Sequence, residues 1–313
     1  MLGFVRSLAA TSAALFFSAF AYGATGYTQQ VAPMPLVDIN NRGVILAASG
    51  PLAFLWNGKP DGAGGQYTLL STPGNDPNVV YAGLSDLDEV VGGFTDFGSG
   101  RRLGFVSSVS GLELIEVPGA ASTTVRAISP NGRYLGVQAY SELGTASSFL
   151  LDRNTGLLSD MSPTGSYGSA IEGVTDSGQV VGRMGTDAGL RSFVFQNGHV
   201  ETFSVGGDAY TFLYGVSDAG YLVGSSGSTP PAPGGPEWNS GFVSHGAETW
   251  KFAQGTRILG VNSSGVAVGV YSLYSTHGVL LTPVPEPASV ALMLGGLVAV
   301  FAWRARRVAP HGG

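Results

Sequence analysis

A short turn pattern recurs six times at nearly constant spacing along this 313-residue chain. Each copy has a small residue, an aliphatic residue, then Asn, Ser or Thr, a turn residue, any residue and Gly. The last positions of the copies are 43, 88, 132, 178, 220 and 265, so the spacings are 45, 44, 46, 42 and 45 residues. Asp88 replaces the glycine in the second copy, and Asp tolerates left-handed backbone better than most residues. Periodicity of this length indicates a repeat architecture.

Each repeat contains the pattern of four short antiparallel strands. An aliphatic strand enters the turn, a second leaves it, and a third follows a loop of variable length. A hairpin turn such as Asn197-Gly198 leads to the fourth strand. The third strands are centred on Phe54, Phe105, Phe149, Phe193 and Phe242.

Four such strands in about 45 residues form one blade of a β-propeller. We therefore predict an all-β, six-bladed propeller over residues 25–283. The alternatives are a β-sandwich and an open β-solenoid, and a solenoid would need polar capping units at its ends.

The two ends of the repeat region predict how the ring closes. The sixth repeat runs from Gly278 to Leu281 into Pro283 and Pro285, so it lacks a fourth strand. The segment Tyr27–Val31 precedes the first repeat and has no partner there. We expect this segment to complete the last blade, which would remove an exposed sheet edge.

Residues 1–24 have the features of a secretory signal peptide. Arg6 precedes an apolar run from Leu8 to Phe20, and Ala19-Phe20-Ala21 has the small-x-small pattern that signal peptidase cleaves. Gly23 and Ala24 are alternative cleavage positions. The other interpretation, an uncleaved membrane helix, is less favoured because the run is short.

Residues 284–313 form a second segment outside the predicted propeller. Pro285-Glu286-Pro287 leads into an apolar run over residues 288–303, and Arg304, Arg306 and Arg307 follow. As a helix, the 16-residue run would span roughly 24 Å, somewhat less than the ~30 Å core of a bilayer. We predict a transmembrane helix over 288–303 with its basic end in the cytoplasm, which places the upstream chain outside.

This C-terminal segment resembles the PEP-CTERM sorting signal of Gram-negative bacteria that make exopolysaccharide. The resemblance implies that exosortase, a membrane transpeptidase-like enzyme, recognises the tail and removes the helix. It also implies an inner-membrane-tethered precursor, followed by attachment at the cell surface or release.

The repeats over about residues 36–282 resemble the HAF repeats of secreted bacterial proteins. Their His-Ala-Phe positions read Leu52-Ala53-Phe54, Leu103-Gly104-Phe105 and Arg191-Ser192-Phe193, so these three copies keep the phenylalanine and not the histidine. His277-Gly278-Val279 keeps only the histidine. This resemblance implies a secreted protein and assigns no biochemical activity.

Composition excludes several functional classes. The chain has no Cys, which rules out disulfides, thiol catalysis and cysteine-ligated metal sites. Removal of both ends with Glu286 retained would leave 11 basic and 21 acidic residues, a net charge of −10, and this argues against nucleic-acid binding. His199, His245 and His277 fall in three different repeats, as expected for solvated turn residues rather than ligands or bases.

Acidic residues recur at the repeated turns as Asp86, Asp88, Asp176 and Asp218. They could suggest calcium, but Asp in a tight turn hydrogen-bonds to its own backbone, which explains them without a metal. No loop has the ligand spacing of an EF-hand. We therefore expect neither a metal nor an organic cofactor.

The variable loops offer the best candidate ligand surface. Connections that leave the second and fourth strands of every blade emerge on one face, and such loops on a rigid frame often hold a recognition site. The alternative is that they are tolerated insertions. The candidate rim residues are Phe97, Arg101, Arg102, Tyr140 and Trp238.

We therefore expect an exported, non-enzymatic module of the cell envelope or biofilm matrix that binds exopolysaccharide or a matrix protein. The alternative is a secreted carbohydrate-active enzyme, a hydrolase or lyase, on the same scaffold. Such an enzyme would need carboxylates that converge near the axis. Its candidates in the rim loops are Asp96, Glu142, Asp187 and Glu237.

Overall fold

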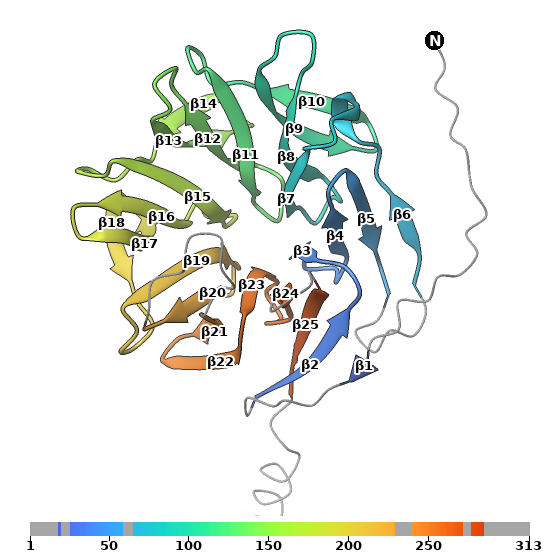
Figure 1. The fold of residues 1–313 in the computed structure, drawn as a ribbon, viewed down its shortest axis with the longest axis vertical. Helices are drawn as coiled ribbons and strands as arrows, with labels where there is room; N and C mark the ends of the chain where they lie inside the picture. Colours follow the sequence, from blue (N-terminus) through green and yellow to red (C-terminus); the bar gives the residue numbers. More distant parts are fainter. Residues whose placement is uncertain (1–17, 20–25, 59–64, 229–238, 272–276, 285–313) are drawn as a thin grey trace, which may run out of the picture.

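Six β-sheets surround a central axis in the computed structural model (Figure 1), which confirms the predicted six-bladed propeller. The structure describes residues 18–19, 26–58, 65–228, 239–271 and 277–284. Blades are numbered here in chain order. Within each blade, the strand nearest the axis comes first, and each later strand pairs antiparallel with the strand before it.

The first three blades are continuous in sequence, and a short 3-10 turn, η1 (Pro73–Asn75), connects blade 1 to blade 2. Blade 1 contains β3 (Leu36–Ile39), β4 (Ile45–Ser49), β5 (Leu52–Trp56) and β6 (Tyr67–Leu69). Blade 2 contains β7 (Val80–Leu84), β8 (Val90–Thr95), β9 (Arg102–Ser108) and β10 (Gly111–Ile115). Blade 3 contains β11 (Ser122–Ile128), β12 (Tyr134–Tyr140), β13 (Ala146–Asp152) and β14 (Leu157–Asp160).

Blades 4 and 5 repeat the same order, and blade 6 combines the two ends of the chain. Blade 4 contains β15 (Gly168–Val174), β16 (Val180–Thr186), β17 (Gly189–Gln196) and β18 (His199–Phe203). Blade 5 contains β19 (Tyr210–Val216), β20 (Tyr221–Gly227), β21 (Ser240–His245) and β22 (Glu248–Gln254). Blade 6 contains β23 (Thr256–Val261), β24 (Ala267–Tyr271), β25 (His277–Pro283), β2 (Tyr27–Ala32) and β1 (Ser18–Ala19).

The N-terminal strand closes the ring. β2 pairs with β25, with Gln29 opposite Leu281 and Val31 opposite Val279, so the predicted strand exchange is confirmed. Figure 1 shows these strands side by side, although they come from opposite ends of the chain. From the sequence we placed residues 1–24 outside the fold. In the full chain, Ser18–Ala19 instead add a short fifth strand along β2.

The chain reverses at opposite ends of each blade, which defines two faces of the disc. On the face that we call the turn face, first strands connect to second strands and third strands to fourth. On the opposite face, which we call the loop face, lie the second-to-third-strand connections and the links between blades. The turns have the predicted backbone: Asp88 has φ 59°, and Asn197 and Gly198 have φ values of 52° and 82°, as a type I′ hairpin requires.

Aromatic side chains of the third strands fill the blades. Phe105, Phe193 and Phe242 are fully buried. Phe193 lies opposite Gly182 on the second strand, and a Cβ at Gly182 would come within 2.1 Å of the Ala170 carbonyl oxygen and 2.9 Å of the Phe193 ring. The recurring aliphatic-aliphatic-Gly sequence of the second strands therefore makes room for the aromatic ring beside it.

Tyr27 fixes the closing strand to the preceding blade. Its ring is buried and meets Trp250 and Phe252 edge-on, with ring centroids 5.4 and 5.7 Å apart. Such pairs add roughly 1 kcal/mol beyond the burial of the ring itself. The start of β2 is therefore held by side-chain packing as well as by the backbone ladder.

We predict that Tyr27→Ala destabilises the ring by about 3–5 kcal/mol, because it leaves a cavity between β2 and blade 5. Thr28→Ala is the matched control, because Thr28 is exposed and its hydroxyl makes one 3.3 Å bond to the Thr282 carbonyl. Urea unfolding followed by tryptophan fluorescence measures both. Equal midpoints for the two variants would contradict the assigned role of Tyr27.

Candidate functional site

The recurring Asn, Ser or Thr of each repeat closes its own turn. The Asn40 Oδ1 accepts a hydrogen bond from the Val44 N–H at 2.9 Å, and the Ser85 Oγ accepts one from the Glu89 N–H at 3.2 Å. Both residues are buried, so these bonds satisfy polar atoms that water does not reach. This residue, and not the Asp that follows it, fixes the shape of the turn.

The repeated Asp residues connect neighbouring blades. Asp86 accepts from the Asn41 N–H at 2.7 Å, Asp176 from the Asn131 N–H at 2.8 Å, and Asp218 from the Asp176 N–H at 2.7 Å. The prediction that they bond within their own turns is therefore wrong for these three. The preceding residue already caps the turn, which leaves the carboxylate free to reach the next blade. We call this series of bonds around the axis the girdle.

The girdle also spans the junction where the ring closes. The Ser263 N–H in blade 6 donates to the Asn41 Oδ1 in blade 1 at 2.8 Å, and Asn262 Nδ2 donates to the Asn40 carbonyl at 3.2 Å. Asp88, at the equivalent glycine position of blade 2, pairs with Arg42 of blade 1. Among the described residues, no group of three acidic or histidine side chains is placed to hold a metal ion.

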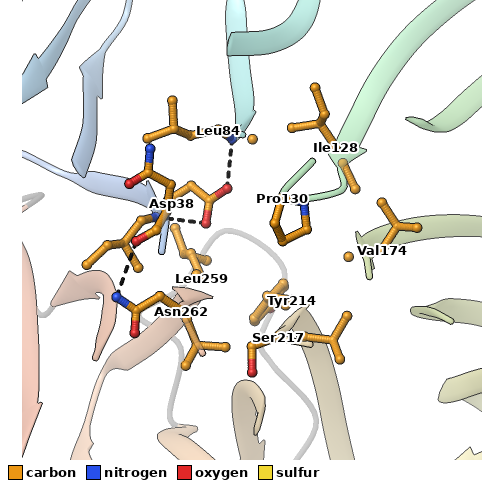
Figure 2. A pocket seen from close by; sticks show the side chains of 18 of the residues that line it. Asp38, Leu84, Ile128, Pro130, Val174, Tyr214, Ser217, Leu259 and Asn262 are labelled. Carbon is orange, nitrogen blue, oxygen red and sulfur yellow. Dashed lines mark hydrogen bonds between the residues drawn. The ribbon is translucent and has the colours of Figure 1, made fainter. Parts of the chain in front are cut away.

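A small cavity lies on the axis (Figure 2). The inner strands of all six blades line it. Its volume is about 50 Å³, which is enough for a few water molecules. Each inner strand has a bulge at the same position. The bulged residues Ala82, Glu172, Tyr214 and Leu259 line the wall. This cavity was not predicted from the sequence.

Asp38 is the only acidic residue at its repeat position. The equivalent residues in the other blades are Gly83, Ala127, Gly173, Gly215 and Gly260. Asp38 accepts hydrogen bonds from the Leu84 N–H of blade 2 and from its own neighbour Ile39, both at 2.8 Å. A Cβ at Gly260 would come within 2.2 Å of Asp38 Oδ1, so blade 6 makes room for this carboxylate. Burial raises the pKa of Asp38 to about 7, against the lowering effect of the two N–H donors.

Glu172 is another acidic residue of the cavity wall, and both of its carboxylate oxygens are paired with arginines. Arg126 Nη2 lies 2.6 Å from Glu172 Oε2, Arg183 binds Oε1, and the guanidinium of Arg183 lies 5.4 Å from the ring centre of Tyr214. Burial alone would raise the pKa of Glu172, but the attraction of the two arginines outweighs it and the pKa is lowered. Glu172 therefore stays ionised and joins blade 4 to blade 3, and Arg183 extends this contact to Tyr214 of blade 5.

Four of the five predicted rim residues lie in the described part of the chain. Arg102 donates to Thr124 Oγ1 at 3.1 Å and to the Gly93 carbonyl at 3.0 Å, so its side chain joins blade 2 to blade 3. Arg101 donates to the Ala120 carbonyl at 2.9 Å. These arginines hold the loop in place, which the sequence did not reveal.

Phe97 is the most solvent-exposed of the four described rim residues. Its side chain is 66% exposed, whereas that of Tyr140 is half-buried. Ala121 connects Arg101 of blade 2 to Tyr140. Its carbonyl accepts a hydrogen bond from Arg101 at 3.5 Å, and its N–H donates to the Tyr140 carbonyl at 2.8 Å. Trp238 lies outside the described residues, as do Pro285, Glu286, Pro287, Arg304, Arg306 and Arg307 of the sorting signal.

The carboxylates proposed for an enzyme come from separate blades. Asp96 is in blade 2, Glu142 in blade 3 and Asp187 in blade 4, whereas Glu237 lies outside the described residues. Asp96 accepts from the backbone and hydroxyl of Ser99 in its own loop, and these bonds lower its pKa. Glu142 and Asp187 are exposed.

The histidines lie at strand ends. His199 and His245 flank equivalent turns and are exposed, and His245 stacks on Tyr221 at 4.1 Å between ring centres. His277 begins β25 at the opposite face. These three histidines are therefore distributed over three blades and both faces.

Residues 283–307 match the PEP-CTERM protein-sorting motif. This supports the sorting signal that the sequence predicted and implies export and a membrane-anchored precursor for exosortase. The described residues contain no helix long and apolar enough to cross a membrane, and the predicted helix over 288–303 lies outside them. No curated protein matched the sequence.

Solved structures show the same fold at low sequence identity. A putative TolB from Agrobacterium tumefaciens has a TM-score of 0.56 at 12% identity, over 81% of this chain and 90% of that one. TolB from Acinetobacter baumannii has a TM-score of 0.49 at 13% identity, over 83% and 64%. The β-propeller domain of the Trilobed protease from Pyrococcus furiosus has a TM-score of 0.45 at 7% identity, over 81% and 98%. At these identities the likeness concerns the fold alone.

We predict that Asp38 makes the ring less stable as the pH rises from about 4 to about 7. Its pKa is 3.8 ordinarily and about 7 in the folded protein, so between these values the folded state holds a proton that the unfolded chain releases. At ~1.36 kcal/mol per pKa unit, the contribution of Asp38 is at most about 4 kcal/mol.

Urea unfolding at several pH values measures this dependence, and Asp38→Asn should remove most of it. Asp187→Asn is the control, because Asp187 is exposed and should leave the slope unchanged. A wild-type stability that stays level or rises over this pH range would contradict the assignment.

Proposed function

We propose that this chain is an exported, surface-sorted, non-enzymatic propeller that binds exopolysaccharide through its loop face. The route rests on the PEP-CTERM match at residues 283–307. The resemblance of the repeats to those of secreted HAF-repeat proteins agrees with that route. The binding role rests on the side chains that the loop face exposes.

The observation that carries the proposal is the repetition of exposed apolar side chains on this face. Blades 1 to 4 each present one at or beside the connection from the second to the third strand. They are Leu52, Phe97, Leu143 and Leu190, with exposed fractions of 54, 66, 95 and 39%. The recurrence of a large exposed apolar side chain near this connection in four blades favours a surface adapted to a ligand over unrelated insertions.

Aromatic residues on the same face favour a sugar polymer. Phe97 and Tyr167 are 66 and 67% exposed, and an aromatic ring offers a flat apolar surface to the C–H face of a sugar ring. Tyr167 lies in the connection from blade 3 to blade 4. The mature charge of −10 would repel polyanions, so a neutral exopolysaccharide fits best.

The arginines beside Phe97 contribute rigidity rather than ligand contacts. Arg101 donates to the Ala120 carbonyl in the link to blade 3, and Arg102 donates to Thr124 of blade 3, so both hold the loop that carries Phe97 against that blade. A loop that is already ordered loses little conformational entropy when a ligand binds. The predicted rim therefore contributes to binding in two ways, through exposed rings and through a fixed frame.

We predict that Phe97→Ala and Tyr167→Ala each weaken retention on an immobilised neutral exopolysaccharide by about tenfold, and that the double variant abolishes it, because stacking of one ring contributes ~1–2 kcal/mol. Affinity electrophoresis in gels that contain the polymer measures this effect. Val109→Ala is the matched control, because Val109 is fully exposed on the turn face of the same blade.

Unchanged mobility of both ring variants would contradict the proposal. Retention by isolated matrix protein in place of polymer would also contradict it. Turnover of the polymer that Asp187→Asn eliminates would instead establish the carbohydrate-active enzyme.

A further inference from the structure

Both ends of the propeller leave it at one point on the turn face. β25 runs from the loop face to the turn face and ends at Pro283, and β2 starts beside it at Tyr27. The Val284 N–H donates to the Gly26 carbonyl at 2.8 Å. The last described residue is therefore fixed to the start of the closing strand.

The sorting signal begins where the fold ends. Its match starts at Pro283, which is also the last residue of β25. Only residues 285–287 separate Val284 from the apolar run that starts at Ala288. Val284 and Ala288 are four residue steps apart and can be separated by at most about 14 Å, so the folded propeller and the start of that run lie close together.

We propose that, in the membrane-anchored precursor, the turn face lies against the lipid headgroups and the loop face points away from the membrane. A blade strand of seven residues, such as β12, spans roughly 23 Å, so the loop face would lie about that much farther from the lipid. The occupant of the turn face is the headgroup layer itself. The sorting enzyme, which acts beside this layer, meets the same face.

The charges of the turn face are compatible with this position because many are paired within the protein. Arg42 binds Asp88, and Arg153 lies 3.1 Å from Glu89 and 2.8 Å from Glu113. The girdle carboxylates accept backbone N–H groups. Because its charges are paired, such a face can approach the lipid headgroups without strong electrostatic repulsion.

This orientation would leave the proposed polysaccharide surface accessible before the tail is processed. The inference needs the sorting route but does not depend on the ligand, so failure of polysaccharide binding would leave it intact.

The absence of Cys allows a direct test with single-cysteine variants of the full-length precursor. Ala247→Cys places a label on the turn face of blade 5, and Leu52→Cys places one on the loop face of blade 1. Both residues are exposed, and both blades adjoin blade 6, so the two labels are equally close to the anchor around the ring. Each variant is labelled with the fluorophore bimane at its cysteine and reconstituted in phosphatidylethanolamine–phosphatidylglycerol vesicles. The lipid headgroups carry a nitroxide, which quenches bimane that lies close to them.

We expect the Ala247→Cys label to lose most of its fluorescence and the Leu52→Cys label to keep nearly all of it. Insertion of a long Gly-Ser linker between Val284 and Pro285 is the control, because it keeps the anchor and frees the propeller. In that variant both labels should be quenched weakly and equally. Equal quenching without the linker, stronger quenching at Leu52→Cys, or no quenching at either position would overturn the proposal.

Discussion

The pairing of β2 with β25 is the constraint on which the rest of the structure depends. The two strands lie some 250 residues apart in sequence, so blade 6 cannot form until the other five blades have brought the ends together. The same closure brings Ser263 to Asn41 and completes the girdle at this junction. It also fixes Val284 beside Gly26, and thereby sets where the sorting signal leaves the protein.

Charged side chains lie at the axis, where the inner strands of the ring come closest to one another. Small residues at one repeat position let these strands approach, and Gly260 gives the space that Asp38 occupies. Asp38 connects blade 1 to blade 2, and Glu172 forms ion pairs with Arg126 and Arg183. The Asp38 and Glu172 carboxylates have hydrogen-bond partners within the protein, and these bonds hold blades in register. We therefore assign the axis to stability, and the recognition role that we propose belongs to the loop face.

The fold could be predicted from the sequence because periodicity, turn residues and strand alternation are local signals. The missing fourth strand of the last repeat even predicted the role of Tyr27–Val31. Contacts between blades could not be predicted, because nothing in a single repeat shows what the next one offers. Asp86 looks like an ordinary turn residue until Asn41 of the neighbouring blade is beside it. For Asp38 a signal did exist: aligned repeats show Gly or Ala at the five equivalent positions. Likewise, only the structure distinguishes the open Phe97 from Arg101 and Arg102, which bind their own protein.

Hydrogen exchange of the mature protein tests ring closure most directly. If the terminal strand is part of the ring, the amides of residues 279–281 and those amides of residues 29–31 that face β25 should exchange as slowly as the amides of β12 in blade 3, and all should become exposed in one cooperative opening. Exchange of residues 29–31 within seconds, while β12 stays protected, would show that β2 is a loose end and would contradict the closed ring.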